Sequence, residues 1–192
     1  MDNFMLYHGS YCEVHSPDLT RCAGFKDFGR GFYLTTSIEQ ARSFSRTSLR
    51  KAVRNGVITE EQEFSIVSAF KCNAESLRRL NVYSFKDADM EWLLCVAGHR
   101  KSRSFPKVVE RYHRFDVIIG KIANDATNAT ITAYMAGAYG DPAGERAAQI
   151  CVSLLLPDRL KNQYCFRTNP ALECLTFQGS ERLDDKADAL SS

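Results

Sequence analysis

Two short runs of mainly apolar residues lie near the start of the chain. They cover residues 4–8 and 31–35 and predict two strands separated by a loop. A helix is expected after the second strand, with Thr36 as its N-cap, Glu39 completing a capping box and residues 55–56 ending it. The inner face of this helix, read at helical spacing, consists of Ile38, Ala41, Ser45, Leu49 and Ala52.

The rest of the chain mixes strands and helices without regular alternation. Strands are expected at residues 63–71, 80–85, 115–120, 163–167 and 172–177. Helices are expected around Met90, Leu93, Leu94 and Ala97, around Ile131, Tyr134, Met135 and Ala138, and from Asp141-Pro142 to a point before Pro157. This order gives no repeated βαβ unit, so it predicts an α+β fold with a largely antiparallel or mixed sheet.

Composition and charge limit the class of protein. With 192 residues, 44% of them hydrophobic, the chain can bury one sizeable core. We expect a single domain over residues 1–180 and a disordered tail over residues 181–192, because the tail is charged and lacks aromatic residues. The charge is nearly balanced, with 25 Lys and Arg against 23 Asp and Glu, which argues against general coating of nucleic acid.

The cellular compartment is also suggested by the sequence. No basic segment followed by an apolar run opens the chain, and no stretch approaches the ~20 apolar residues of a membrane span. Seven cysteines occur without a CxxC pair, so we expect a reduced protein in the cytoplasm.

Two short segments carry the candidate chemistry. Residues 8–10 are His-Gly-Ser, and residues 29–33 are Gly-Arg-Gly-Phe-Tyr. A histidine beside a glycine brings a polar ring and a bare backbone to the same small molecule, and a Gly-x-Gly turn before two aromatic residues can present a flat ring. Together these features suit the nicotinamide end of NAD. The glycine pair enters a strand instead of opening a helix, so the fingerprint of doubly wound dinucleotide-binding folds does not apply.

These motifs resemble the first two motifs of the ADP-ribosyltransferase superfamily, in the branch of diphtheria toxin and poly(ADP-ribose) polymerase. The third motif of that branch is a glutamate on a late strand, and its match here is Asn162-Gln163-Tyr164. Residues 4–178 are more closely similar to an uncharacterised bacterial domain family that is grouped with this superfamily and associated with toxin–antitoxin systems. The wider matches are Lys26-Asp27-Phe28-Gly29, Glu91-Trp92-Leu93, Asp116-Val117-Ile118-Ile119-Gly120, Ala123-Asn124-Asp125 and Ala171-Leu172. The resemblance implies a split mixed or antiparallel sheet with flanking helices.

The resemblance also implies roles for individual residues. His8 would bind a ribose hydroxyl of NAD, and the backbone of Gly9 would pair with the nicotinamide carboxamide. Tyr33 would stack on the nicotinamide ring, and Phe44 would cover its other face. The alternatives are a surface histidine, a core tyrosine and a core phenylalanine. Ala41 stands where that branch often has a serine that binds the carboxamide. The expected NAD-binding residues are His8, Gly9, Ser10, Gly31, Tyr33 and Phe44.

Gln163 stands where the resembling enzymes have their glutamate, which stabilises positive charge on the ribose through its 2′-hydroxyl. Glutamine can orient that hydroxyl, but it has no charge and cannot act as a base near neutral pH. We therefore expect single transfer instead of chain elongation, with a base supplied by the acceptor or by Asp125, which could equally be a turn or cap residue. The expected catalytic residues are His8, Tyr33, Gln163 and Asp125.

The resemblance implies an NAD-dependent mono-ADP-ribosyltransferase. NAD would be its substrate, an intracellular protein or nucleic acid its acceptor, and a small antitoxin its partner, with a role as a bacterial toxin. Two alternatives stay open: an NAD glycohydrolase that uses water, and a catalytically silent module that binds NAD or a partner. We expect neither a metal nor a membrane to take part.

Other groups of residues are weaker candidates. Two basic groups could be solvated faces or could bind phosphates or nucleic acid. They are Arg42, Arg46, Arg50 and Arg54, and Arg100, Lys101, Arg103 and Lys107 around Phe105. Cys12, His15 and Cys22 lack a zinc-site spacing and a fourth ligand. Ser10 and Cys12 lie near His8, but no carboxylate completes a triad.

Overall fold

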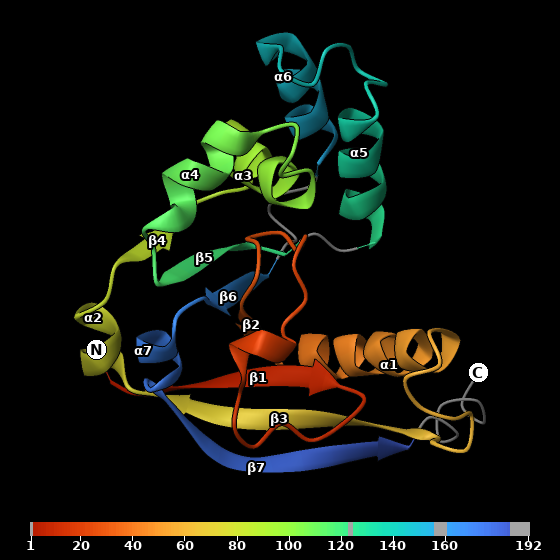
Figure 1. Cartoon of the computed structure of the whole chain (residues 1–192), viewed down its shortest axis with the longest axis vertical. Helices are drawn as coiled ribbons and strands as arrows, with labels where there is room; N and C mark the ends of the chain where they lie inside the picture. The colour runs from red at the N-terminus through yellow and green to blue at the C-terminus, as the bar shows by residue number, and fades with distance from the viewer. Residues whose placement is uncertain (1, 123–124, 156–160, 185–192) are drawn as a thin grey trace.

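One seven-stranded mixed sheet runs through the molecule (Figure 1), in the order β4-β5-β6-β2-β1-β3-β7. The computed structural model describes residues 2–122, 125–155 and 161–184, except for the side chains of residues 125 and 126. The strands are β1 (Phe4–Ser10), β2 (Phe32–Thr35), β3 (Phe64–Cys72), β4 (Val82–Ser84), β5 (Val117–Lys121), β6 (Asn162–Phe166) and β7 (Leu175–Asp184). β4 and β5 are parallel, and the other neighbouring strands are antiparallel. The α+β fold with a mixed sheet is therefore confirmed.

Helices flank this sheet. They are the short 3-10 helix η1 (Leu19–Arg21) and the α-helices α1 (Ile38–Arg54), α2 (Ala74–Arg78), α3 (Met90–Arg100), α4 (Pro106–His113), α5 (Asp125–Met135), α6 (Glu145–Leu154) and α7 (Asn169–Leu172). Figure 1 shows α3, α4, α5 and α6 gathered beyond β4 and β5, whereas α1 lies alongside β1. Within the described ranges, none of these helices is long and apolar enough to cross a membrane.

Two hydrophobic clusters cover opposite faces of the central strands. The first packs α3, α5 and α6 against Ile118 and Cys165, with Trp92 fully buried. The second contains Phe32 and Phe166 and lies on the other face, because neighbouring residues of a strand point to opposite sides. The helix α1 lies on β1 and β3 through the four residues Ala41, Ser45, Leu49 and Ala52, which are all buried as predicted.

Several boundaries differ from the sequence predictions. The N-cap of α1 is Ser37, which accepts a hydrogen bond from the Gln40 amide, and not Thr36. Thr36 and Ser37 both precede an acidic or amide residue at the capping-box position, so sequence could not separate them. The helix α6 begins at Glu145 instead of at Asp141-Pro142, because the Asp141 side chain caps a turn at Ala143.

The expected domain boundary at residue 180 falls inside β7. This strand pairs with β3 as far as Asp184, which lies opposite Phe64. Glu181 lies opposite Val67 in this ladder, and its carboxylate holds the guanidinium of Arg42 on α1 at 2.9 Å. The charges at residues 181–184 thus belong to an edge strand, where charged side chains are common. Residues 185–192 of the expected tail lie outside the described residues.

Candidate functional site

The ring of His8 meets the backbone of Tyr33 between β1 and β2. His8 Nδ1 lies 2.8 Å from the carbonyl oxygen of Tyr33. A carbonyl oxygen only accepts, so Nδ1 carries the proton and the neutral ring presents Nε2 as an acceptor. Burial lowers the pKa of His8 below its ordinary value of 6.5, and the bond to Tyr33 opposes part of that shift. Among the described residues, nothing donates to His8 Nε2.

The sheet opens at this contact. In the described part of the chain, the register between β1 and β2 consists of the pair Tyr7 and Thr35, and the ladder does not continue toward Gly9. The His8 ring binds the Tyr33 carbonyl beside that point. The backbone edge of Gly9 that faces β2 is therefore not engaged in a ladder between these two strands.

The rings of His8 and Tyr33 stand on different sides of β2. The His8 ring packs on the ring of Phe32, with centroids 4.5 Å apart. The Tyr33 hydroxyl donates to the carbonyl of Gly29 at 2.7 Å and accepts from the amide of Phe28 at 2.9 Å. Burial raises the pKa of Tyr33 well above its ordinary value of 10. The phenol thus fixes the turn before β2, and the expected clasp of one ligand by both rings is not what this arrangement shows.

Both expected ligand-binding glycines have close protein neighbours. A Cβ on Gly9 would lie 2.0 Å from the carbonyl oxygen of Ala41 and 2.6 Å from the amide nitrogen of Ser45, which are both backbone atoms of α1. A Cβ on Gly31 would lie 2.4 Å from the sulfur of Cys165. Close packing therefore requires glycine at both positions, whatever the backbone of Gly9 binds on its β2 side. Ser10 is buried.

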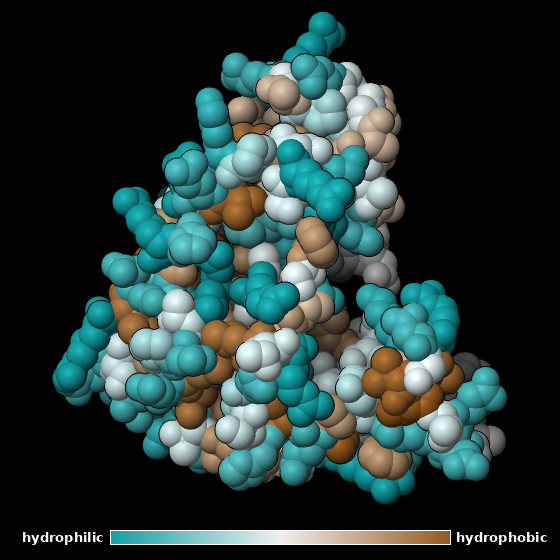
Figure 2. Space-filling view, in the orientation of Figure 1, coloured by the Kyte–Doolittle hydropathy of each residue, from teal (hydrophilic) through white to brown (hydrophobic). Residues whose placement is uncertain are grey.

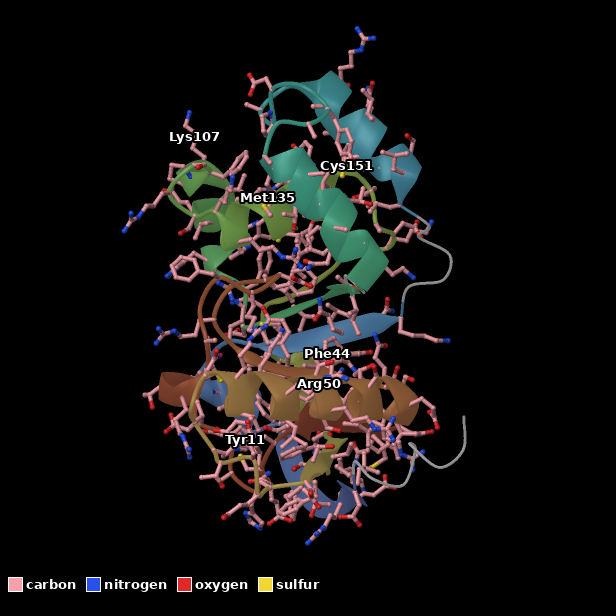
Figure 3. All side chains as sticks on the ribbon, turned by 90° about the vertical axis from the view of Figure 1, so that its right-hand side faces the viewer. Tyr11, Phe44, Arg50, Lys107, Met135 and Cys151 are labelled. Atoms are coloured by element: carbon pink, nitrogen blue, oxygen red, sulfur yellow. The ribbon has the colours of Figure 1, made fainter. Side chains whose placement is uncertain are left out.

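Phe44 is exposed on α1. Its side chain keeps 43% of its surface in solvent, so it is not the core residue that one alternative proposed. Figure 3 shows it on the edge of α1 that is nearer to β6 and α5. Figure 2 shows the surface hollowed between the part that carries α3 to α6 and the part that carries α1. Ala41 lies one helical turn before Phe44 and is buried against Gly9.

Gln163 lies on the same face of the sheet as Tyr33. Thr35 is directly opposite Gln163, and Tyr33 is directly opposite Cys165, so the alternation of side chains puts all four on one side. The Gln163 side chain is buried. Its Nε2 donates to Asp27 Oδ2 at 2.8 Å and to the carbonyl oxygen of Lys121 at 3.3 Å.

Asp27 brings a carboxylate to the site, which the sequence did not predict. Its Oδ1 accepts from Arg100 Nε at 2.9 Å and from Nη2 at 2.6 Å, and both side chains are largely buried, at 14% and 16% exposed. Arg100 also donates to Asn128 on α5 at 2.6 Å. One signal for Asp27 was present in the sequence, because it lies two residues before the second motif begins and belongs to the wider match that ends at Gly29. Its partner Gln163, 136 positions away, could not be inferred from spacing.

Asp125 is the first residue of α5. Its side chain lies outside the described residues, so its expected role as a base stays a prediction.

The two basic groups are only partly free surfaces. Arg42 is paired with Glu39 and Glu181, and Arg50 on α1 (Figure 3) donates to Thr47. In the second group, Arg100 turns inward to Asp27 and Lys101 Nζ donates to the carbonyl of Met135, whereas Arg103 and Lys107 are exposed. Arg100 is therefore not part of an exposed cationic surface, whereas Lys101, Arg103 and Lys107 keep their charges at the surface.

The remaining candidate cluster has other contacts. The ring of His15 packs on Phe177 with centroids 4.5 Å apart, and Cys22 donates to the carbonyl of Asp18. Ser10 Oγ and Cys12 Sγ are 3.9 Å apart. Across the described part of the chain, no three His, Cys, Asp or Glu side chains are grouped closely enough to hold a metal ion.

A family model matches residues 4–177, which is nearly the whole described domain. The chain belongs to the family "Protein of unknown function (DUF3990)". Because the match begins in β1 and ends in β7, the DUF3990 unit includes the motifs of β1, β2 and β6 together. A comparison with curated proteins found no match.

Proposed function

We propose that this DUF3990 chain binds NAD as a substrate and transfers its ADP-ribosyl group to a macromolecule in the bacterial cytoplasm. The separation of β1 and β2 at His8 carries the proposal. Beside it lie the imidazole acceptor of His8 and the backbone of Gly9, which is outside the ladder between β1 and β2. The Gln163 amide lies two strands from β1, on the face of the sheet opposite to the His8 ring. The resemblance of the three motifs gives these groups their proposed ligand.

In the proposed reaction, the bond between ribose C1′ and the nicotinamide nitrogen breaks. Its electron pair goes to the pyridinium nitrogen, so nicotinamide leaves as a neutral molecule. The acceptor forms a new bond to C1′ and releases one proton to its own base or to water. The transition state carries positive charge on the ribose, so acceptors on its hydroxyls stabilise it more than they stabilise bound NAD.

Individual residues have the following proposed roles. His8 Nε2 accepts a hydrogen bond from a ribose hydroxyl, and the open backbone edge of Gly9 pairs with the carboxamide. Tyr33 supports this edge from the turn before β2, and Phe44 stacks on the nicotinamide ring. Gln163 orients the 2′-hydroxyl. A role as a toxin that is held inactive by a small antitoxin is part of the proposal and rests on the resemblance alone.

The test is transfer of radiolabelled ADP-ribose from NAD to a bacterial lysate. Protease and nuclease treatment then sort the labelled product as protein or nucleic acid. His8→Ala and Tyr33→Ala are expected to abolish transfer, and Glu75→Gln, which removes an exposed carboxylate on α2, is the matched control. If both site variants keep wild-type transfer, the site is wrongly assigned.

A second candidate is a binding module that holds NAD without turnover. It is favoured by one observation: the residue on β6 is an amide, and its nitrogen is already bound to Asp27. Calorimetry with NAD, together with analysis of the products, separates these functions. Stoichiometric binding of NAD without release of nicotinamide and without labelled acceptor supports the binding module. Release of nicotinamide and free ADP-ribose in the absence of any acceptor supports hydrolysis of NAD.

A further inference from the structure

The Gln163 amide can adopt only one orientation. Its two polar neighbours are a carboxylate oxygen of Asp27, at 2.8 Å, and the carbonyl oxygen of Lys121, at 3.3 Å. Both can only accept hydrogen bonds, so the NH2 group must face them. Gln163 Oε1 therefore points away from Asp27, and among the described residues nothing donates to it.

Asp27 is itself held from the opposite side. Two nitrogens of Arg100 bind Oδ1, which leaves Oδ2 for Gln163. The resulting chain of contacts runs from Asn128 on α5 through Arg100 on α3 and Asp27 in the loop before β2 to Gln163 on β6. Three other segments thus fix the amide group on β6, and the bonds to both oxygens of the Asp27 carboxylate are charge-assisted.

The carboxylate also changes the amide electronically. An N–H bond donated to an anion pushes electron density toward the amide oxygen, because linked hydrogen bonds polarise one another. Gln163 Oε1 is thereby a stronger acceptor than a solvated glutamine would be. This polarisation comes from the Asp27 carboxylate in the neighbouring loop, whose own charge is balanced by Arg100.

We infer that Asp27 is a positioning residue that orients and polarises Gln163, so that the pair does what a single glutamate does in the resembling enzymes. The inference rests on the proposed function, since the bound hydroxyl is that of the NAD ribose. A glutamate at position 163 is therefore not expected to improve the site by itself. Gln163→Glu alone places the new carboxylate in contact with the carboxylate of Asp27. It also places a carboxylate oxygen, which can only accept, against the carbonyl oxygen of Lys121. The single substitution therefore does not produce a working glutamate-type site.

The experiment is a double-mutant cycle of wild type, Asp27→Asn, Gln163→Glu and the doubly substituted protein. In the last, the new amide at position 27 can donate to the new carboxylate at position 163, so amide and carboxylate have exchanged places. Three quantities are measured for each protein: kcat and KM for NAD consumption over pH 5.5–8.5, and the urea midpoint of unfolding. Glu75→Gln is carried through as the control for loss of a remote, exposed carboxylate.

Asp27→Asn is expected to lower kcat about tenfold, which is the usual difference between a charge-assisted and a neutral hydrogen bond, with a smaller change in KM. Gln163→Glu is expected to lower both kcat and the urea midpoint at pH 7 and to recover partly at lower pH, where one carboxyl is protonated. The double variant is expected to regain midpoint and kcat above either single variant.

The outcomes separate the inference from the proposed function. Additive effects in the cycle, or a gain of activity by Gln163→Glu alone, would overturn the inference while leaving NAD turnover by the wild type intact. If the wild type neither binds nor consumes NAD, the proposed function fails, and the cycle of urea midpoints still decides whether Asp27 orients Gln163. Coupling of the midpoints then supports the orientation, and additivity refutes it.

Discussion

Nδ1 of His8 is hydrogen-bonded to the backbone carbonyl of Tyr33, at 2.8 Å, and not to its ring. One side chain thus takes a position that a strand-to-strand bond would otherwise hold, and the sheet parts there. The two nitrogens of the imidazole have different tasks. Nδ1 fixes the geometry of β1 and β2, and Nε2 is left to accept a hydrogen bond from a ligand.

These two tasks can be separated by substitution. Asparagine places its amide nitrogen near the position of Nδ1 but has no counterpart of Nε2. His8→Asn is therefore expected to keep the thermal midpoint of the wild type and to bind NAD roughly tenfold more weakly, the value of about one hydrogen bond to a polar ligand. His8→Ala is expected to lose stability as well, by about 0.5–1.5 kcal/mol. Calorimetry and thermal unfolding of the three proteins check this; equal affinities for His8→Asn and wild type would contradict it.

Gly9 provides a test of the packing of α1. A methyl group there would meet two backbone atoms of α1 at 2.0 and 2.6 Å, and neither can rotate away. Gly9→Ala is therefore expected to lower the free energy of unfolding by at least roughly 1–3 kcal/mol, as overpacking does. Gly24→Ala is the matched control, because a Cβ at Gly24 meets nothing within 4 Å. Urea denaturation measures both, and similar losses in the two variants would rule out the packing argument.

Most of the fold could be predicted from the sequence, because the spacing of apolar residues and the positions of turn-forming residues indicate the same elements. The inner face of α1 followed from the helical spacing of small and apolar residues, and the strand of His8 from a short run of apolar residues. The helix α4 was missed because its region, from Pro106 to His113, is rich in charged residues and was interpreted as part of a basic patch. Its amphipathic face is nevertheless present in the sequence, because Val108 and Tyr112 are four positions apart, and both pack in the cluster that contains α3.

The site was located less completely, for a different reason. The motifs identified His8, Tyr33 and Gln163, which lie on three neighbouring strands. Sequence could not show that the rings of His8 and Tyr33 lie on different sides of β2, because that depends on where the strands part. It could not pair Asp27 with Gln163 either, because a contact between residues so far apart in the chain is set by the sheet order alone.

Phe44 gives a test of ligand stacking that does not disturb the core. Because its side chain is 43% exposed, Phe44→Ala is expected to change the free energy of unfolding little, by up to about 0.5 kcal/mol. Loss of a stacked ring is expected to weaken NAD binding by about 0.5–1.5 kcal/mol, or roughly 2–12-fold. Leu154→Ala, on α6 and 53% exposed, is the control for removing exposed apolar surface. If both variants bind NAD like the wild type, Phe44 does not touch the ligand.

Tyr33 has a structural task that its ring alone cannot perform. The hydroxyl satisfies the Phe28 amide and the Gly29 carbonyl, so Tyr33→Phe leaves two polar backbone groups without their partner. The expected cost is about 1–3 kcal/mol of unfolding free energy for each buried group left unsatisfied. Because Tyr33 supports the open edge of Gly9 through this turn, Tyr33→Phe is expected to weaken NAD binding as well, and Tyr33→Ala to weaken it further. Wild-type affinity of Tyr33→Phe in calorimetry, with the protein still folded by circular dichroism, would contradict this supporting role.

The stability of the protein is expected to fall in mild acid, because two histidines are held neutral. Burial lowers the pKa of both His8 and His99 from the ordinary value of 6.5. His99 donates from Nδ1 to the Cys95 carbonyl and keeps Nε2 buried without a partner among the described residues. Below about pH 6.5 these histidines are protonated in the unfolded chain but stay neutral in the folded protein. The free energy of unfolding therefore decreases as the pH falls. It levels off once the pH is below the lowered pKa values of the folded state.

Urea unfolding at half-unit steps from pH 7.5 to 5.5, at constant ionic strength, measures this slope. Replacing each histidine by asparagine removes its titration, so His8→Asn and His99→Asn should each flatten the curve and the double substitution should flatten it most. The affinity for NAD is also expected to decrease as the pH falls, because a protonated Nε2 of His8 can no longer accept a hydrogen bond from a ribose hydroxyl. This decrease is expected below pH 6.5. A binding curve that instead rises as the pH falls would mean that His8 acts as a cation, and the assignment of Nε2 as an acceptor would have to be abandoned.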